Sequence, residues 1–152
     1  MAAKMYWLHA LTPLHVGTGR GVGFIDLPVA REKATGWPVV PGSGIKGVLA
    51  DRHGATDDKR KTDPKLAAAF GRADDKLANS GALIFTDARM VCLPVRSLYG
   101  TFAWVTSPLA LRRLARDLEN VKPAELPTAL PEVADANQIK LPESGSDLGS
   151  PT

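Results

Sequence analysis

The spacing of apolar residues predicts two main helices. One begins in the sequence PGSGIKG with Ser43 as its N-cap, and the other follows Ser107 as N-cap with Pro108 in its first turn. A shorter helix is expected over residues 64–70, before Gly71. The apolar stripes of the two main helices are formed by Ile45, Val48 and Leu49 and by Leu111, Leu114, Ala115 and Leu118.

In other parts of the chain, apolar residues either alternate with polar ones or follow one another in short runs, and both patterns are typical of strands. The expected strands are residues 5–11, 37–40, 81–93 and 101–105, and residues 22–29 fit an edge strand or a protruding hairpin interrupted by Pro28. The polar segment 51–63 is expected to be an exposed loop. Strands interleaved with helices predict an α+β fold, with helices over a sheet in a ferredoxin-like arrangement.

Length and charge favour one basic domain followed by a tail. Residues 1–119 carry 17 Lys and Arg against 11 Asp and Glu, whereas residues 120–152 carry 2 against 5. A basic body suits an anionic partner such as a nucleic acid, and it equally fits an ordinary solvated surface. We expect a domain over residues 1–120 and a flexible tail over residues 121–152, which hold five of the twelve prolines.

The remaining composition favours a cytoplasmic protein. The single cysteine, Cys92, excludes an internal disulfide, and its apolar surroundings, MVCLPV, predict a core position. No segment resembles a signal peptide or approaches the length of a membrane span. We therefore expect no membrane partner.

The first candidate site is the loop HVGTGRGVG. Its glycines permit positive φ and a close backbone approach, and exposed N–H groups in such a loop can cradle phosphates. The candidate binding residues are His15, Gly17, Thr18, Gly19 and Arg20. A flexible surface loop without a ligand explains the same composition.

The second candidate site is the start of the first main helix. Unpaired N–H groups and the helix dipole favour an anion at such a position. Gly42, Ser43 and Gly44 form the entry and Lys46 adds a positive charge. An ordinary capped helix is the alternative. The basic run at residues 59–61 is either solvated or in contact with nucleic acid.

Asp26 is the candidate catalytic residue. It lies between bulky apolar residues in FIDLP, where it is either a turn-forming carboxylate or a functional one. A carboxylate beside a phosphodiester holds a hydrated Mg²⁺ or orients the attacking 2′-hydroxyl of RNA. One aspartate makes a weak metal site, which indicates slow cleavage dominated by positioning.

Three strings together resemble the RAMP superfamily of CRISPR proteins, and more narrowly the backbone subunit of the type III-B (Cmr) effector complex. They are LTPLHVGTGRGVGFIDLPVAREKATGWPVVPGSGIKGVL, AFG and GALIFTDARMVCLPVRSLYGTFAWVTSP, and they cover most of residues 8–108. The similarity fades after the helix at 108–119. Chains of this family continue further, so the sequence is expected to be an N-terminal portion, a fragment or a short member.

The resemblance implies a ferredoxin-like palm with a protruding β-hairpin thumb, incomplete at its C-terminal end. It implies copies of the subunit stacked in a filament on a CRISPR guide RNA, together with other Cmr subunits. It further implies cleavage of single-stranded target RNA at regular intervals with Mg²⁺ or another divalent cation. Asp26 corresponds to the catalytic and metal-binding aspartate, His15 to a residue that contacts RNA or supports the site, and the PGSGIKG helix start to the guide-binding region.

Two alternatives remain open. The chain is a non-catalytic RNA-binding scaffold if its fold and basic surface hold guide RNA without cleavage. A phosphate-binding enzyme for small molecules would use the same glycine loops, and it would bind nucleotides more strongly than RNA.

Overall fold

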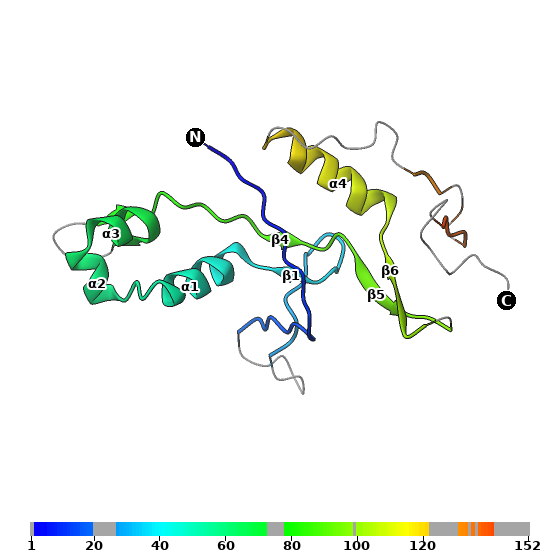
Figure 1. Cartoon of the computed structure of the whole chain (residues 1–152), viewed down its shortest axis with the longest axis horizontal. Coiled ribbons are helices and arrows are strands. Elements are labelled where there is room, and N and C mark those ends of the chain that lie inside the picture. Colours follow the sequence, from blue (N-terminus) through cyan, green and yellow to red (C-terminus); the bar gives the residue numbers. More distant parts are fainter. Residues whose placement is uncertain are drawn as a thin grey trace. The chain divides into compact units, whose positions relative to one another are not determined.

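The computed structural model describes residues 2–19, 27–72, 78–98, 100–121, 131–133, 135 and 137–141. The chain divides into two compact units. We name Leu8–Arg89 the loop–helix unit, and Met1–Trp7 with Met90–Thr152 the hairpin–helix unit. Helices and short antiparallel strands occur in both parts of the chain (Figure 1), which confirms the expected α+β class.

In the loop–helix unit, strand β1 (Val39–Val40) pairs antiparallel with β4 (Ala88–Arg89). Val39 faces Arg89 and Val40 faces Ala88 in the register. Of the extended piece expected at residues 37–40, the last two residues are confirmed as strand. Directly after Pro41 the chain enters helix α1 (Gly42–Arg52).

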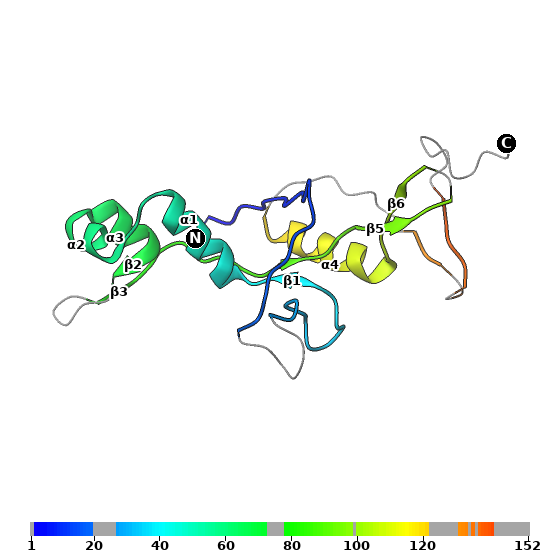
Figure 2. The same ribbon diagram turned by 90° about the horizontal axis from the view of Figure 1, so that it is seen from below.

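The rest of this unit is a small helical cluster. Helix α2 (Asp57–Thr62) and helix α3 (Pro64–Phe70) lead into β2 (Gly71–Arg72), which pairs antiparallel with β3 (Asn79–Ser80). These four elements lie together at one end of the unit (Figure 2). Phe70 is buried there, and its ring lies 6.2 Å from that of His53.

Helix α3 agrees with its prediction, because its signals are local. Pro64 occupies the first turn, and the Asp63 carboxylate accepts hydrogen bonds from the amides of Lys65 and Leu66 at 2.8 and 3.3 Å. Gly71 ends the helix with φ of 89°, a left-handed conformation that glycine adopts without steric cost.

The expected loop at residues 51–63 is wrong, because α2 lies within it. Thr56 caps the helix by accepting a hydrogen bond from the Lys59 amide at 3.3 Å. Acidic residues occupy the first turn and basic residues the last, an order that complements the helix dipole. Ion pairs at i,i+3 spacing, such as Lys61 to Asp58 at 3.7 Å, add to this local stability.

The hairpin–helix unit contains β5 (Leu93–Arg96), β6 (Phe102–Val105) and helix α4 (Pro108–Glu119). The two strands pair antiparallel, and the rings of Phe102 and Trp104 meet edge to face at 5.6 Å. Ser107 accepts a hydrogen bond from the Ala110 amide at 3.2 Å, which confirms the predicted cap of α4. Of its three arginines, Arg112 and Arg116 are exposed and Arg113 is half-buried.

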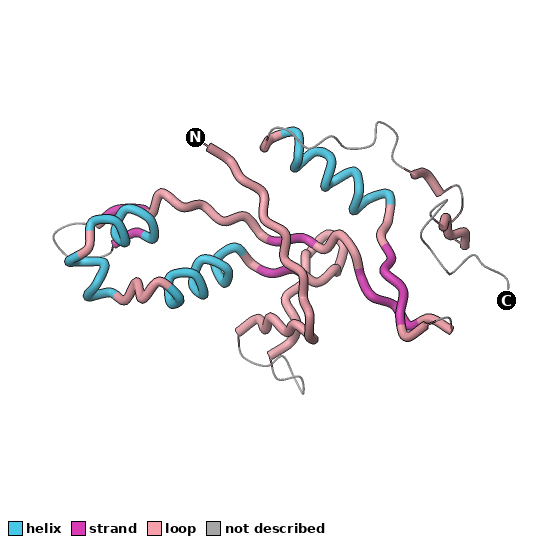
Figure 3. The backbone as a smooth tube through the Cα atoms, viewed as in Figure 1, coloured by secondary structure: helices cyan, strands magenta, loops and turns pink. Residues whose placement is uncertain are grey.

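Two expected strands are wrong in whole or in part. Residues 5–11 pair with no strand of the described chain, and of residues 81–93 only β4 and the first residue of β5 are strand (Figure 3). Strand formation needs a partner, and a partner is not encoded in the run itself. Cys92 is exposed, so its predicted core position is also wrong.

The described residues bury few apolar side chains. The buried ones are Ala30, Ala55, Phe70 and Ala110, and no described helix has the length and apolar character that crossing a membrane requires. Much of the predicted tail lies outside the described residues, namely residues 122–130, 134, 136 and 142–152. The sheets are three separate antiparallel pairs in the described chain, so the ferredoxin-like arrangement stays a prediction.

Candidate nucleic-acid interface

The two ends of the glycine loop are hydrogen-bonded to each other. Ala30 donates its amide to the carbonyl of Val16 at 2.7 Å, and Thr18 donates to the carbonyl of Pro28 at 2.9 Å. Gly17 and Val29 form an antiparallel bridge between these two bonds. The two legs of the loop, residues 16–18 and 28–30, are therefore joined as an antiparallel pair. Of the edge strand or hairpin predicted at residues 22–29, residues 22–26 lie outside the described residues.

The same hydrogen-bond series continues to the first helix. Ala30 accepts from the amide of Val39 at 3.0 Å, and Arg31 forms an antiparallel bridge with Pro38. Ala30 is only 2% exposed, because neighbouring segments cover it on both sides. Backbone bonds thus connect the loop legs through β1 to β4, and β1 leads directly into α1. The two candidate sites are anchored in one ladder of the loop–helix unit.

The side chain of His15, at the start of the loop, holds the backbone at Leu27, where the chain returns from the loop. Its Nε2 lies 2.8 Å from the carbonyl oxygen of Leu27, so in this arrangement the imidazole donates to the carbonyl. Leu27 has φ of 48°, and among the described non-glycine residues it is the one with positive φ. A left-handed conformation costs a non-glycine residue about 1–2 kcal/mol, so contacts such as the His15 bond are needed to hold it.

Gly17 packs tightly against Leu27. A Cβ atom added at Gly17 would lie 3.0 Å from the Leu27 Cβ, which is tighter than nine in ten real Cβ contacts, so Leu27 would have to shift by a few tenths of an ångström. Gly19 has φ of 60°, where glycine is favoured. Thr18 donates its hydroxyl to the Pro28 carbonyl at 3.2 Å. These residues shape the loop, as the glycine pattern predicted.

Asp26 and Arg20 lie outside the described residues, so their predicted roles stay predictions. The neighbouring Leu27 is described, and through it His15 contacts the backbone directly after Asp26. Within the described ranges, no three His, Cys, Asp or Glu side chains gather where a metal ion would be held.

The start of α1 is built differently from the prediction. The helix begins at Gly42 after Pro41, and Ser43 makes no cap. Instead, the carboxylate of Asp87 accepts a hydrogen bond from the Gly42 amide at 2.8 Å. The capping group comes from 45 residues away in sequence. Asp87 therefore already places a negative charge at this helix end, which sequence reasoning missed.

Gly42 has no room for a side chain. An added Cβ would lie 2.2 Å from the carbonyl oxygen of Phe85, so only glycine lets residues 85–87 approach the helix. In contrast, added Cβ atoms at Gly44 and Gly47 meet nothing within 4 Å. Ser43 and Gly44 are exposed and Lys46 is half-buried, which leaves this part of the helix surface open to a ligand.

Comparison with known proteins decides the family. The sequence profile of the RAMP superfamily matches residues 7–148, which is most of the chain.

The chain belongs to the RAMP superfamily.

Its relatives within the superfamily include CRISPR endoribonucleases. The chain is 39% identical over 136 residues to the CRISPR system Cmr endoribonuclease Cmr4 of Pyrococcus furiosus, a match that covers 89% of this chain and 45% of that protein. It is 35% identical over 86 residues to the CRISPR system Cms endoribonuclease Csm3 of Streptococcus thermophilus, covering 51% of this chain and 39% of the relative.

A solved structure agrees with this membership. The crystal structure of oligomeric Cmr4 from Pyrococcus furiosus superposes with a TM-score of 0.59 at 35% identity, over 82% of this chain and 43% of that one. The RAMP chain described here thus spans less than half the length of the Cmr4 and Csm3 proteins that it matches.

Proposed function

We propose that this RAMP protein is an RNA-binding backbone subunit of a type III-B CRISPR effector complex, and that it cleaves target RNA complementary to the guide. The observation that carries the proposal is the 39% identity to Cmr4 over 89% of the chain, a span that includes most of the loop–helix unit. Its proposed partners are the guide RNA, the single-stranded target RNA, other Cmr subunits and further copies of itself, and its proposed compartment is the cytoplasm. The solved relative is described as oligomeric, which supports self-association.

The pairing of the two loop ends supports a hairpin thumb. Residues 16–18 and 28–30 form an antiparallel pair, as the base of a protruding hairpin requires. We propose that this hairpin is the thumb on a ferredoxin-like palm. The three short sheets of the described chain would be parts of that palm.

In the proposed cleavage, the chain acts mainly by positioning. Asp26 orients or deprotonates the 2′-hydroxyl of the target RNA, whose oxygen attacks the adjacent phosphorus. The bond from phosphorus to the 5′-oxygen of the next nucleotide breaks, and that oxygen takes a proton from water, which leaves a 2′,3′-cyclic phosphate and a 5′-hydroxyl. His15 holds the carbonyl of Leu27, the residue directly after Asp26 in sequence. The described residues supply no set of metal ligands. A divalent cation, expected to be Mg²⁺, would neutralise phosphate charge when bound.

RNA binding in this proposal is mainly electrostatic. Ser43, Gly44 and Lys46 offer the open part of the helix surface to the guide backbone, whereas the amide of Gly42 is already bonded to Asp87. The loop residues Gly17, Thr18, Gly19 and Arg20 contact RNA from the hairpin, and His15 supports the site by holding Leu27. Such phosphate contacts position the strand without reading its sequence.

The test is cleavage of a guide-complementary RNA by the reconstituted complex with Mg²⁺, comparing this chain with its Asp26→Ala and Asp26→Asn variants. We expect regularly spaced products from the unchanged chain and none from either variant, with RNA binding retained in all three. Cleavage that survives both substitutions would remove Asp26 from the mechanism. RNA binding without cleavage by any form would make the chain a non-catalytic scaffold.

A further inference from the structure

A basic pocket lies in the helical cluster, away from the glycine loop. Its volume is about 320 Å³, at the lower end of the range for small-ligand sites. Three cationic side chains line it: Arg60 and Lys61 from α2, and Arg72 from β2. Nothing in the proposed function uses these residues.

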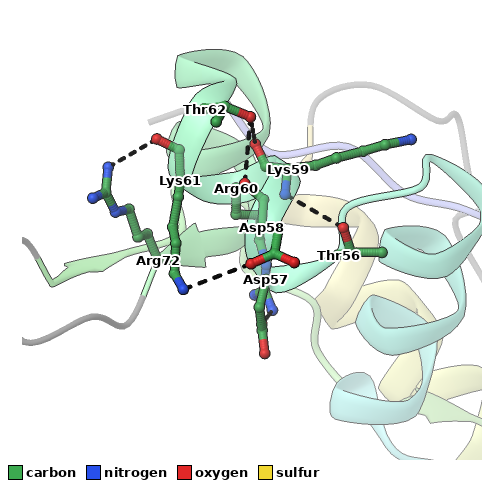
Figure 4. Close-up of polar contacts among 8 residues, drawn as sticks. All are labelled: Thr56, Asp57, Asp58, Lys59, Arg60, Lys61, Thr62 and Arg72. Atoms are coloured by element: carbon green, nitrogen blue, oxygen red, sulfur yellow. Dashed lines mark hydrogen bonds and ion pairs between the residues drawn. The ribbon is translucent and has the colours of Figure 1, made fainter.

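The arginines are held in place by backbone contacts. Arg60 donates from Nη1 to the carbonyl of Gly71 at 3.3 Å, and Arg72 donates from Nη1 to the carbonyl of Lys61 at 3.2 Å. Figure 4 shows the Arg72 guanidinium at the backbone carbonyl of Lys61, while the Lys61 side chain extends toward Asp58. Residues of β2 and α2 thus line the same pocket. A preorganised cluster of this kind loses little entropy when it binds an anion.

The aspartates that pair with two of the three cations, Arg60 and Lys61, face solvent. Arg60 pairs with Asp57, and Lys61 pairs with Asp58 at 3.7 Å, but the two aspartate side chains are 84% and 96% exposed. Ion pairs this exposed are weak and screened by salt, so an incoming anion competes with them readily. In addition, Nε of Arg60 is buried without a hydrogen-bond acceptor in the described chain.

The other side of the pocket is apolar. Pro64, Ala67 and Ala68 of α3 line it, and Asn79 of β3 contributes its amide, which donates to the carbonyl of Ala67 at 3.0 Å. A purely inorganic anion would gain nothing from this surface. A nucleotide carries both a phosphate for the cations and a flat ring or ribose for the apolar side.

We infer that this pocket binds one phosphate-bearing nucleotide of a single-stranded RNA, with the phosphate against Arg60, Lys61 and Arg72 and the nucleoside over α3. The inference rests on the proposed RNA-binding function and adds to it a second contact point, on α2, α3 and the β2–β3 pair. Two residues of the basic run at 59–61 line the pocket, Arg60 and Lys61. Lys61 is the one that can be replaced most easily, because its ion pair is exposed.

Lys61→Gln is the test variant and Lys59→Gln is its matched control. Both remove one positive charge from α2, but only Lys61 lines the pocket. Lys61 makes an exposed ion pair with Asp58, so its replacement leaves the fold intact. We expect Lys61→Gln to weaken binding of a fluorescent oligouridylate by about 3- to 10-fold. The slope of log affinity against log salt concentration should fall in magnitude by about 0.7, the value for one phosphate contact with a single strand. Lys59→Gln should keep the original slope.

A second measurement reports on the pocket itself. RNA should protect Lys61 from acetylation more than Lys59, as measured by mass spectrometry of the full chain. The same experiment is repeated with inorganic phosphate and with uridine monophosphate, each at the same phosphate concentration as the RNA. If either protects Lys61 as well as RNA does, the pocket binds a free anion or a free nucleotide, and the RNA assignment is wrong.

The two proposals fail in different ways. If Lys46→Ala weakens RNA binding and Lys61→Gln behaves like Lys59→Gln, the pocket assignment is wrong and RNA binding at α1 stands. If the unchanged chain binds no RNA, both are wrong.

Discussion

The imidazole of His15 and the carbonyl of Leu27 meet at 2.8 Å, across twelve residues of sequence. Leu27 has φ of 48°, and its Cβ would lie 3.0 Å from a Cβ added at Gly17. A strained residue persists only where its surroundings hold it, and such residues cluster at functional sites. Here the strained residue directly follows the predicted catalytic Asp26.

His15→Ala should therefore lower target cleavage more than RNA binding. Loss of the hydrogen bond lets Leu27 relax and displaces Asp26, and a misplacement of about 1 Å costs about 100-fold in rate. We expect cleavage by the reconstituted complex to fall by about 10- to 100-fold, with RNA affinity changed less than about threefold. His15→Gln, whose amide nitrogen lies near the position of Nε2, should recover part of the rate. Equal losses in binding and in cleavage would instead make His15 an RNA contact.

Lys46→Ala should weaken RNA binding to a similar degree for unrelated sequences. Its contact is a phosphate contact in our proposal, so the slope of log affinity against log salt should fall by about 0.7. Titrations of several oligonucleotides at several salt concentrations measure both quantities. A loss restricted to one sequence would contradict a backbone contact.

Gly42→Ala and Gly47→Ala should have opposite effects on α1. An added methyl group at Gly42 meets the Phe85 carbonyl at 2.2 Å, and overpacking of this kind costs about 1–3 kcal/mol. At Gly47 the methyl group meets nothing, so the helix gains up to about 1 kcal/mol from its better propensity. Amide hydrogen exchange over residues 42–52 measures the local opening free energy. Similar effects of the two changes would contradict the packing of residues 85–87 on the helix start.

Asp87→Asn separates the charge of the cap from its hydrogen bond. Asparagine keeps an acceptor for the Gly42 amide and removes the negative charge from the helix end. We expect α1 to lose about 0.3–1 kcal/mol of local stability and the chain to bind RNA more tightly at low salt. Asp87→Ala removes the bond as well and should cost about 1 kcal/mol more. Unchanged RNA affinity in both variants would place the RNA away from this helix end.

Ser107→Ala and Ser43→Ala test which serine is a cap. Ser107 accepts a hydrogen bond from the Ala110 amide, so its replacement should cost α4 about 1 kcal/mol. Ser43 makes no cap, and its replacement should change α1 by only a few tenths of a kcal/mol. Hydrogen exchange of residues 108–119 and 42–52 gives the two values. A large loss at α1 would restore the predicted role of Ser43.

Local signals were sufficient where the stabilising partners are close in sequence. The α4 helix begins after Ser107 with Pro108 in its first turn, because a capping bond spans only three residues. The α3 helix ends before Gly71 for a similar reason. Even α2 carried a local signal, the TDDKRK order of cap, acids and bases, although its polar composition favoured a loop.

Pairing across long stretches of sequence could not be predicted in the same way. The strand expected at residues 5–11 has apolar residues that remain exposed, Tyr6 at 75% and Trp7 at 64%, because no described strand pairs with them. The first turn of α1 was misassigned because its acceptor is Asp87. Both errors concern a partner whose identity depends on how distant segments meet.

Residue types at short spacing were enough to predict the α+β class, three of the helices, the glycine-rich loop and the resemblance to the RAMP superfamily. Four features became visible only in the folded chain: Ala30 joins the loop to β1, His15 holds Leu27, Asp87 caps α1, and Arg60 and Arg72 line one pocket. Each of them is a contact between residues far apart in sequence, and such a contact depends on how the chain folds back on itself, which no local pattern encodes.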